Sequence, residues 1–235
     1  MRLDKLLSDM NVGTRSEIKK NIRKGQVSVN GETIKDAGIS VSGDEEIVYL
    51  GQRIQYETFE YYMMNKPAGV ISASEDTRQE TVLDLMDTNR RKDLFPVGRL
   101  DKDTTGLLLI TNDGQLAHDM LSPKKHVDKT YFVRVQGRIT DDMVKAFETG
   151  IDIGDEKDTA PAVLKVINSG EISEAEVTIT EGRYHQVKRM FEAVGGKVDY
   201  LKRLSMASLV LDEALAPGEY RRLTDEEVAG LKSKT

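Results

Sequence analysis

The segment FPVGRLDKDTTGLLLITNDG, residues 95–114, joins a charged loop to an unbroken aliphatic run. The run at residues 107–110 leads to an Asp113-Gly114 pair, a pattern typical of a buried strand that ends in a turn. A strand anchored in the core can hold the loop before it rigidly against a ligand. We therefore expect function in that loop, whose charged residues are Arg99, Asp101, Lys102 and Asp103.

Composition limits what the protein can be. The chain has 235 residues, of which 38% are hydrophobic and 31% charged, enough for one large domain and a small one. It has no cysteine, which excludes disulfides and thiolate metal sites. No apolar run approaches the roughly 20 residues of a membrane span, and the first residues lack the apolar centre of a signal peptide. We expect a cytoplasmic protein with no membrane segment.

The net charge of −6 conceals three basic segments. Residues 1–35, 122–138 and 183–203 each carry a net charge of +4, so the rest of the chain is strongly acidic. Such clusters are often solvated faces, but segregation on this scale can also give an acidic protein one positive surface. The pattern indicates a phosphate-backbone ligand, that is, a nucleic acid.

Residues 1–50 are predicted to form a small domain with two helices and a sheet. Leucines and methionine at helical spacing predict a helix over 2–10, and a Thr14 cap with Glu17 three residues later predicts a second helix ending at Gly25. An Asn30-Gly31 turn between short apolar stretches predicts a hairpin. The basic residues that this domain offers to a nucleic acid are Arg2, Arg15, Lys19, Arg23 and Lys24.

The polar stretch 51–59 is predicted to be a linker, and residues 60–235 are predicted to form the second domain. Strand and helix patterns alternate there without regular βαβ units, which favours an α+β fold with a mixed sheet. A short helix is predicted over 81–86. No internal repeat and no low-complexity segment is present.

Two clusters in the second domain could carry chemistry. Asp101 and Asp103 could form a glycosidase-like carboxylate pair, or Asp103 could merely cap a turn. Residues 180–196, TEGRYHQVKRMFEAVGG, offer an anion site, and either Lys188 or Arg189 could orient a buried aspartate. His185 could be a base or a structural residue. Because there is no HExxH, Gly-rich phosphate loop or serine elbow, metal, nucleotide and acyl chemistry have no support.

Four motifs, NKPAGVISA, FPVGRLDKDTTGLLLITNDG, KTYFVRV and EGRYHQVKRMFEAVG, together resemble the pseudouridine synthases that modify ribosomal RNA. Residues 1–48 resemble the αL (S-four-type) RNA-binding domain that one branch of this family carries. The motifs DTTGLLL, TEGRYHQVKRMF and LAPGEYRRLTDEE resemble the members that act on small-subunit (16S) RNA. The resemblance covers essentially the whole chain and implies a mixed, mainly antiparallel catalytic sheet flanked by helices.

The resemblance also implies roles for single residues. Asp101 would be the nucleophile, Arg99 would fill the space left by a flipped base, and Tyr131 would pack on the uracil. Lys188 would pair with Asp101, with Arg189 as the alternative. The residues expected to hold RNA in the second domain are Lys66, Arg183, His185 and Arg189. No cofactor or metal is implied, and a monomer is the default.

The target implied for this branch is the uridine numbered 516 in small-subunit RNA. Three other readings stay open at this point. The chain could act on large-subunit (23S) RNA, it could be a non-catalytic ribosome-assembly protein that binds RNA, or it could be a glycoside hydrolase using Asp101 and Asp103. Against a glycoside hydrolase, the sequence has no tryptophan on which a sugar ring could stack.

Overall fold

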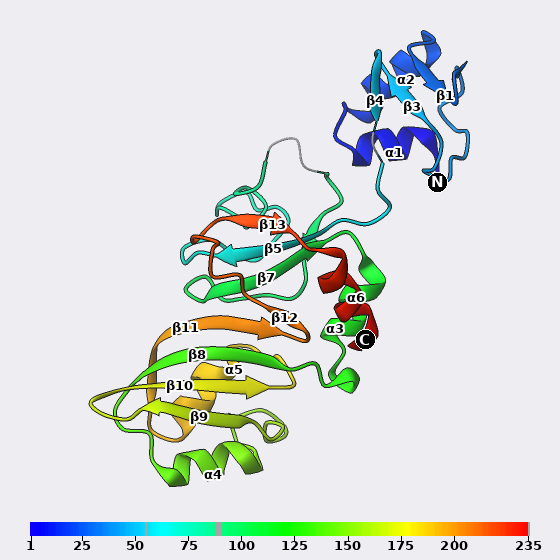
Figure 1. Ribbon diagram of the computed structural model, residues 1–235. Helices are drawn as coiled ribbons and strands as arrows, with labels where there is room; N and C mark the ends of the chain where they lie inside the picture. The colour runs from blue at the N-terminus through cyan, green and yellow to red at the C-terminus, as the bar shows by residue number, and fades with distance from the viewer. Residues whose placement is uncertain (55, 88–90, 235) are drawn as a thin grey trace. The chain divides into compact units, whose positions relative to one another are not determined.

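The computed structural model describes residues 1–54, 56–87 and 91–234 and divides the chain into two compact units. The first comprises Met1–Glu60 and Met86–Leu94, and the second comprises Tyr61–Leu85 and Phe95–Thr235. Each unit has its own sheet and its own hydrophobic core, and Figure 1 labels most of the elements of both.

The first unit combines helices α1 (Leu3–Asp9) and α2 (Arg15–Arg23) with a sheet that has four strands in the described residues. The sheet order is β2 (Glu32–Thr33), β1 (Val27–Val29), β3 (Ile47–Tyr49) and β4 (Gln52–Ile54). The predicted capping box begins α2, since the Thr14 hydroxyl accepts from the Glu17 amide and the Glu17 carboxylate accepts from the Thr14 amide. The buried apolar residues of both helices belong to one core with residues of β1 and β3.

The first unit extends past the predicted boundary at residue 50. Residues 52–54, which the sequence places in a linker, form β4 and pair with β3 in antiparallel register. Leu50 and Gly51 join the two strands with φ angles of 51° and 80°, the left-handed pair that a tight hairpin requires. The strand escapes sequence analysis because its residues lie on a sheet edge and are largely exposed, so they do not alternate between apolar and polar.

The second unit is built on one mixed sheet, with nine strands in the described residues. The pairings are antiparallel except for that between β7 and β11, so the predicted mainly antiparallel α+β sheet is confirmed. Along the sheet the order is β13 (Tyr220–Arg222), β5 (Tyr61–Lys66), β7 (Thr105–Thr111), β11 (Lys197–Met206), β8 (Lys129–Gln136), β10 (Ile172–Ile179) and β9 (Val163–Asn168). Two short strands lie off this path, β6 (Phe95–Pro96) beside β7 and β12 (Leu209–Val210) beside β11.

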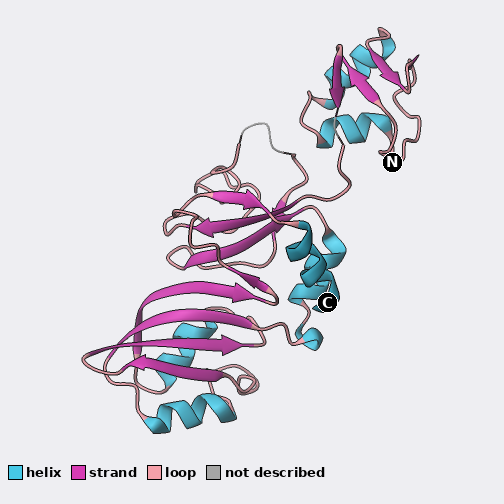
Figure 2. Ribbon diagram, viewed as in Figure 1, coloured by secondary structure: helices cyan, strands magenta, loops and turns pink. Residues whose placement is uncertain are grey.

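Helices flank this sheet, as Figure 2 shows. They are α3 (Gly114–Leu121), the short 3-10 helix η1 (Pro123–Lys125), α4 (Asp141–Thr149), α5 (Gln186–Ala193) and α6 (Asp225–Lys234). Helix α4 packs on β9, α5 on β11 and α6 on β12. The helix predicted over 81–86 is wrong: these residues form turns, in which the Asp84 carboxylate accepts hydrogen bonds from the amide and hydroxyl of Thr81.

Strand β7 is the centre of the core, as the opening motif predicts. Leu107, Leu108, Leu109 and Ile110 have no exposed surface. Just before them, Gly106 has a φ of 98°, and a Cβ there would lie 2.3 Å from the main-chain oxygen of Arg203 on β11. Only glycine allows β7 and β11 to approach so closely, and this contact fixes the start of β7 and the loop that precedes it.

Candidate active site

The charged loop at residues 99–103 is held by the buried side chain of Lys66, the last residue of β5. Lys66 is fully buried, and its ammonium donates to the main-chain oxygens of Asp101 at 3.1 Å and Thr104 at 2.9 Å. It also donates to the oxygens of Pro67 and Lys102. Burial lowers the pKa of Lys66 to about 8, against the opposing effect of Asp103 and Asp101. The sequence predicts that Lys66 binds RNA, whereas the structure buries its ammonium and directs it to main-chain oxygens of the loop.

The side chain of Asp101 lies between two residues of the second cluster. The Lys188 ammonium is 3.2 Å from its carboxylate, and His185 Nε2 is 3.5 Å from it. Lys188 also contacts Asp103 at 2.6 Å, so one ammonium bridges both aspartates. The sequence left Lys188 and Arg189 as alternatives. Within the described residues Lys188 is the one that contacts Asp101, and Arg189 pairs with Asp155 instead.

The contact between Lys188 and Asp103 shifts the pKa values of both residues. The hydrogen bond from Lys188 lowers the pKa of Asp103 below its usual range. Burial by itself would lower the pKa of Lys188, but its hydrogen bonds to Asp103 and Asp101 outweigh that effect and raise it. Lys188 therefore stays a cation at neutral pH, and Asp103 stays an anion.

Arg183 and Arg189, both predicted to hold RNA, are occupied with the loop at residues 152–158. Arg189 pairs with Asp155 at 2.6 Å and also donates to the main-chain oxygens of Ile153 and Tyr184. Arg183 donates to the main-chain oxygens of Lys157 and Asp158 at 2.6 and 2.7 Å. Each side chain is about a quarter exposed, and the contacts of both arginines fix the loop beside α5.

Tyr131 is buried on β8 and lines a small cavity of about 70 Å³ that Asp101 and Arg99 also line. Arg99 is exposed, and its side chain forms no hydrogen bond or ion pair with any residue that the structure describes. Thr104 lines the same cavity, and its buried hydroxyl has no partner in the described chain. The cavity thus brings together a carboxylate, an aromatic ring, a free guanidinium and a free hydroxyl.

A cleft of about 830 Å³ adjoins this cavity and shares Arg99, Asp101 and His185 with it. Its wall also includes Lys129, a residue that sequence analysis did not single out. Lys129 is buried and donates to the main-chain oxygen of Val127 at 2.8 Å, and burial lowers its pKa to about 8. The alternation of side chains along β8 could have identified Lys129, because it places Lys129 on the same face as Tyr131.

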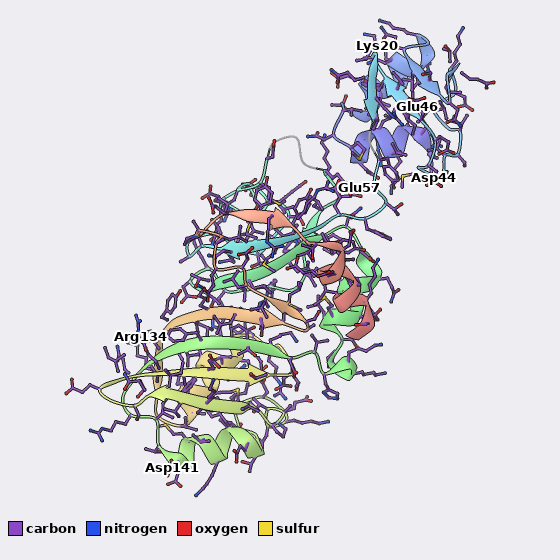
Figure 3. All side chains as sticks on the ribbon, viewed as in Figure 1. Lys20, Asp44, Glu46, Glu57, Arg134 and Asp141 are labelled. Atoms are coloured by element: carbon purple, nitrogen blue, oxygen red, sulfur yellow. The ribbon has the colours of Figure 1, made fainter. Side chains whose placement is uncertain are left out.

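In the first unit, α2 carries a hollow of about 510 Å³ lined by Ser16, Lys19, Lys20, Arg23 and Lys24. Lys20, which Figure 3 labels, is exposed, as are Arg23 and Lys24. Lys19 lies 3.7 Å from Asp4, a carboxylate that Arg2 also binds at 3.0 Å. Arg15 is exposed but does not line the hollow. The cations that line the hollow therefore lie in the second half of α2 and directly after it, while Arg15 lies at the start of the helix.

Comparison with known proteins agrees with this division into units. The model of the S4 domain matches residues 1–47, and the model described as RNA pseudouridylate synthase matches residues 60–193. An uncharacterized RNA pseudouridine synthase, YtzG of Bacillus subtilis, is 51% identical, with 97% of each chain covered. Ribosomal small subunit pseudouridine synthase A of Escherichia coli is 42% identical, covering 98% of this chain and all of its own.

A solved structure of a pseudouridylate synthase has a similar fold. The crystal structure of a pseudouridylate synthase is 39% identical and covers 98% of this chain and 99% of its own, with a TM-score of 0.70. The matched segments contain the loop of Asp101, the strand of Tyr131 and the helix of Lys188. On these grounds the chain belongs to the RNA pseudouridylate synthase family, in the branch of the small-subunit enzymes that carry an N-terminal S4 domain.

Proposed function

We propose that this protein converts one uridine of small-subunit ribosomal RNA, the uridine numbered 516, into pseudouridine. The single observation that supports this most is the placement of Asp101 between Lys188 and His185, at the wall of a small cavity that Tyr131 also lines. A carboxylate held this way is oriented toward a ligand by its neighbours, as a nucleophile must be.

The reaction is an isomerisation. The bond between N1 of uracil and the ribose carbon breaks, the base turns, and a bond forms between C5 and the same carbon. The C5 hydrogen leaves as a proton and N1 gains one, so no oxidant, reductant or cofactor is consumed. Asp101 can serve by adding to the uracil ring or by stabilising a ribosyl cation or glycal route. Tyr131, on the cavity wall, is the residue that we assign to the C5 proton.

The target base must leave its stack before it can reach Asp101. Arg99 suits the space that the base vacates, because it is exposed and its side chain forms no hydrogen bond or ion pair in the described chain. A planar guanidinium can replace both the stacking and the hydrogen bonds of a base. The S4 domain, through the basic hollow on α2, would add affinity for the RNA backbone.

The test is tritium release from RNA labelled at C5 of uridine, because each turnover frees the C5 hydrogen to water. Wild-type protein should release tritium from small-subunit RNA, and Asp101→Asn should release none while binding RNA with unchanged affinity. Asp103→Asn is the matched control and should keep most of the activity. Release by Asp101→Asn at the wild-type rate would overturn the nucleophile assignment.

The same assay separates the neighbouring functions. Release from large-subunit RNA instead of small-subunit RNA would make the protein an enzyme with another target. RNA binding without release from either would make it a non-catalytic assembly protein. Mapping pseudouridines in cells that lack the protein, and again after restoring it, identifies the position. The cytoplasmic location and the monomeric state stay predictions from the sequence.

A further inference from the structure

Tyr184 presents an uncovered aromatic face at the cleft. It is 70% exposed, more than any other large hydrophobic side chain in the described residues. Its other face is covered by the ring of His185, with centroids 3.8 Å apart and planes inclined by 19°. Both rings line the cleft of about 830 Å³. The pair is therefore a two-layer stack with one side open to a further flat ring.

The stack is held in place and is not the tip of a free loop. His185 has a left-handed backbone, with a φ of 49°, directly before α5. Its ring is tied to the reaction centre by the 3.5 Å contact with Asp101. The Arg189 guanidinium donates to the main-chain oxygen of Tyr184 at 3.2 Å. Because these contacts fix both residues before any ligand arrives, little conformational entropy is lost when a ring docks on Tyr184.

The order of the layers decides which ring would dock there. His185 contacts Asp101, Tyr184 covers His185, and a third ring would lie on the far side of Tyr184. A base in that position is too far from Asp101 to be the one that reacts. Unpaired RNA bases stack on aromatic side chains whatever their identity, because every base has a π face.

We propose that Tyr184 forms a stacking subsite for an unpaired base that neighbours the target uridine. The inference rests on the proposed function for the nature of the ligand, and it adds a residue that binds substrate without touching the reacting atoms. The hydroxyl of Tyr184 has no partner among the described residues, so the subsite depends on the ring and not on the phenol.

The experiment compares Tyr184→Ala and Tyr184→Phe with wild-type protein on a short single-stranded RNA that contains the target. RNA affinity and KM should worsen about 5- to 100-fold in Tyr184→Ala, as loss of one base stack predicts, while kcat stays within about 2-fold. Tyr184→Phe should match wild type. The salt dependence of binding should not change, because no phosphate contact is lost. Ile172→Ala, which removes exposed apolar surface from β10, is the control.

A second arm identifies the base. Abasic nucleotides are placed one at a time on either side of the target, and the affinity loss caused by Tyr184→Ala should vanish on one of these RNAs only. Unchanged affinity in Tyr184→Ala, or a loss that persists on every abasic RNA, would overturn the subsite. Failure of wild-type protein to release tritium would instead refute the proposed function, since the binding arm is read without turnover.

Discussion

The ammonium of Lys66 donates to the main-chain oxygen of Asp101 at 3.1 Å, from a position with no exposed surface. A buried cation thus fixes the backbone of the loop, while the exposed side of the same loop presents the Asp101 carboxylate to Lys188 and His185. The carboxylate is aimed by contacts from both sides, and the two sets of contacts can be tested separately.

Replacing Lys66 with methionine keeps the length of the side chain but leaves the carbonyl groups of the loop without their donor. We expect the free energy of unfolding to fall by about 2–4 kcal/mol, because buried acceptors lose their partners. We expect kcat to fall about 10- to 100-fold, because a small displacement of Asp101 moves its carboxylate out of the geometry that the reaction needs. Urea unfolding and tritium release measure the two effects. Lys145→Met, on the exposed face of α4, is the control and should change neither.

The pKa of Lys66 makes the same contact depend on pH. Burial lowers it from 10.5 to about 8. Between these values the unfolded chain holds a proton that the folded chain has released, so stability rises with pH there. We expect wild type to gain stability relative to Lys66→Met as pH increases from about 8 to 10.5. The difference between the two proteins removes the effect of Lys129, and a constant difference over this range would contradict the assignment.

Lys188 acts on the carboxylate side of the loop. Lys188→Met should lower kcat about 10- to 100-fold, because Asp101 loses the cation that orients it. Lys188→Arg should recover part of that loss. In Lys188→Met the pKa of Asp103 should rise toward its ordinary value, since the hydrogen bond that lowers it is gone. Carboxyl-carbon NMR titration follows that change directly.

The neighbouring arginine provides the matched control for Lys188. Arg189 pairs with Asp155 and does not contact Asp101, so Arg189→Met should loosen the loop at 152–158 and leave the pKa of Asp103 where it is. A larger loss of kcat in Arg189→Met than in Lys188→Met would reverse the two assignments.

The hollow on α2 predicts a change in salt dependence. Replacing Lys20, Arg23 and Lys24 with glutamine should weaken RNA binding and reduce the slope of log affinity against log salt by about 2, as loss of three phosphate contacts predicts. Turnover at saturating RNA should be unchanged. Filter binding across a range of salt concentrations measures the slope. The control replaces Lys145 and Lys165, which lie outside the hollow, with glutamine. If this control lost as much RNA affinity and as much salt slope, only the net charge of the protein would matter.

Much of the local structure follows from sequence alone. Thr14 and Glu17 form the capping box that starts α2, and the four aliphatic residues of β7 are as buried as their pattern predicts. Asn30 and Gly31 adopt the positive φ angles of the predicted turn. These features depend on contacts between residues close in the chain, or on a burial pattern that repeats along it, and both are visible in the order of residues.

The tertiary structure decided which charges are free. Lys66 and Arg99 look equally available in the sequence, yet one is buried under the loop and the other is exposed beside the cavity. Lys188 and Arg189 are adjacent, and the turn of α5 sends one to Asp101 and the other to Asp155. A cation's role depends on the carboxylate or carbonyl that folding brings to it from far along the chain, and no local pattern encodes that partner.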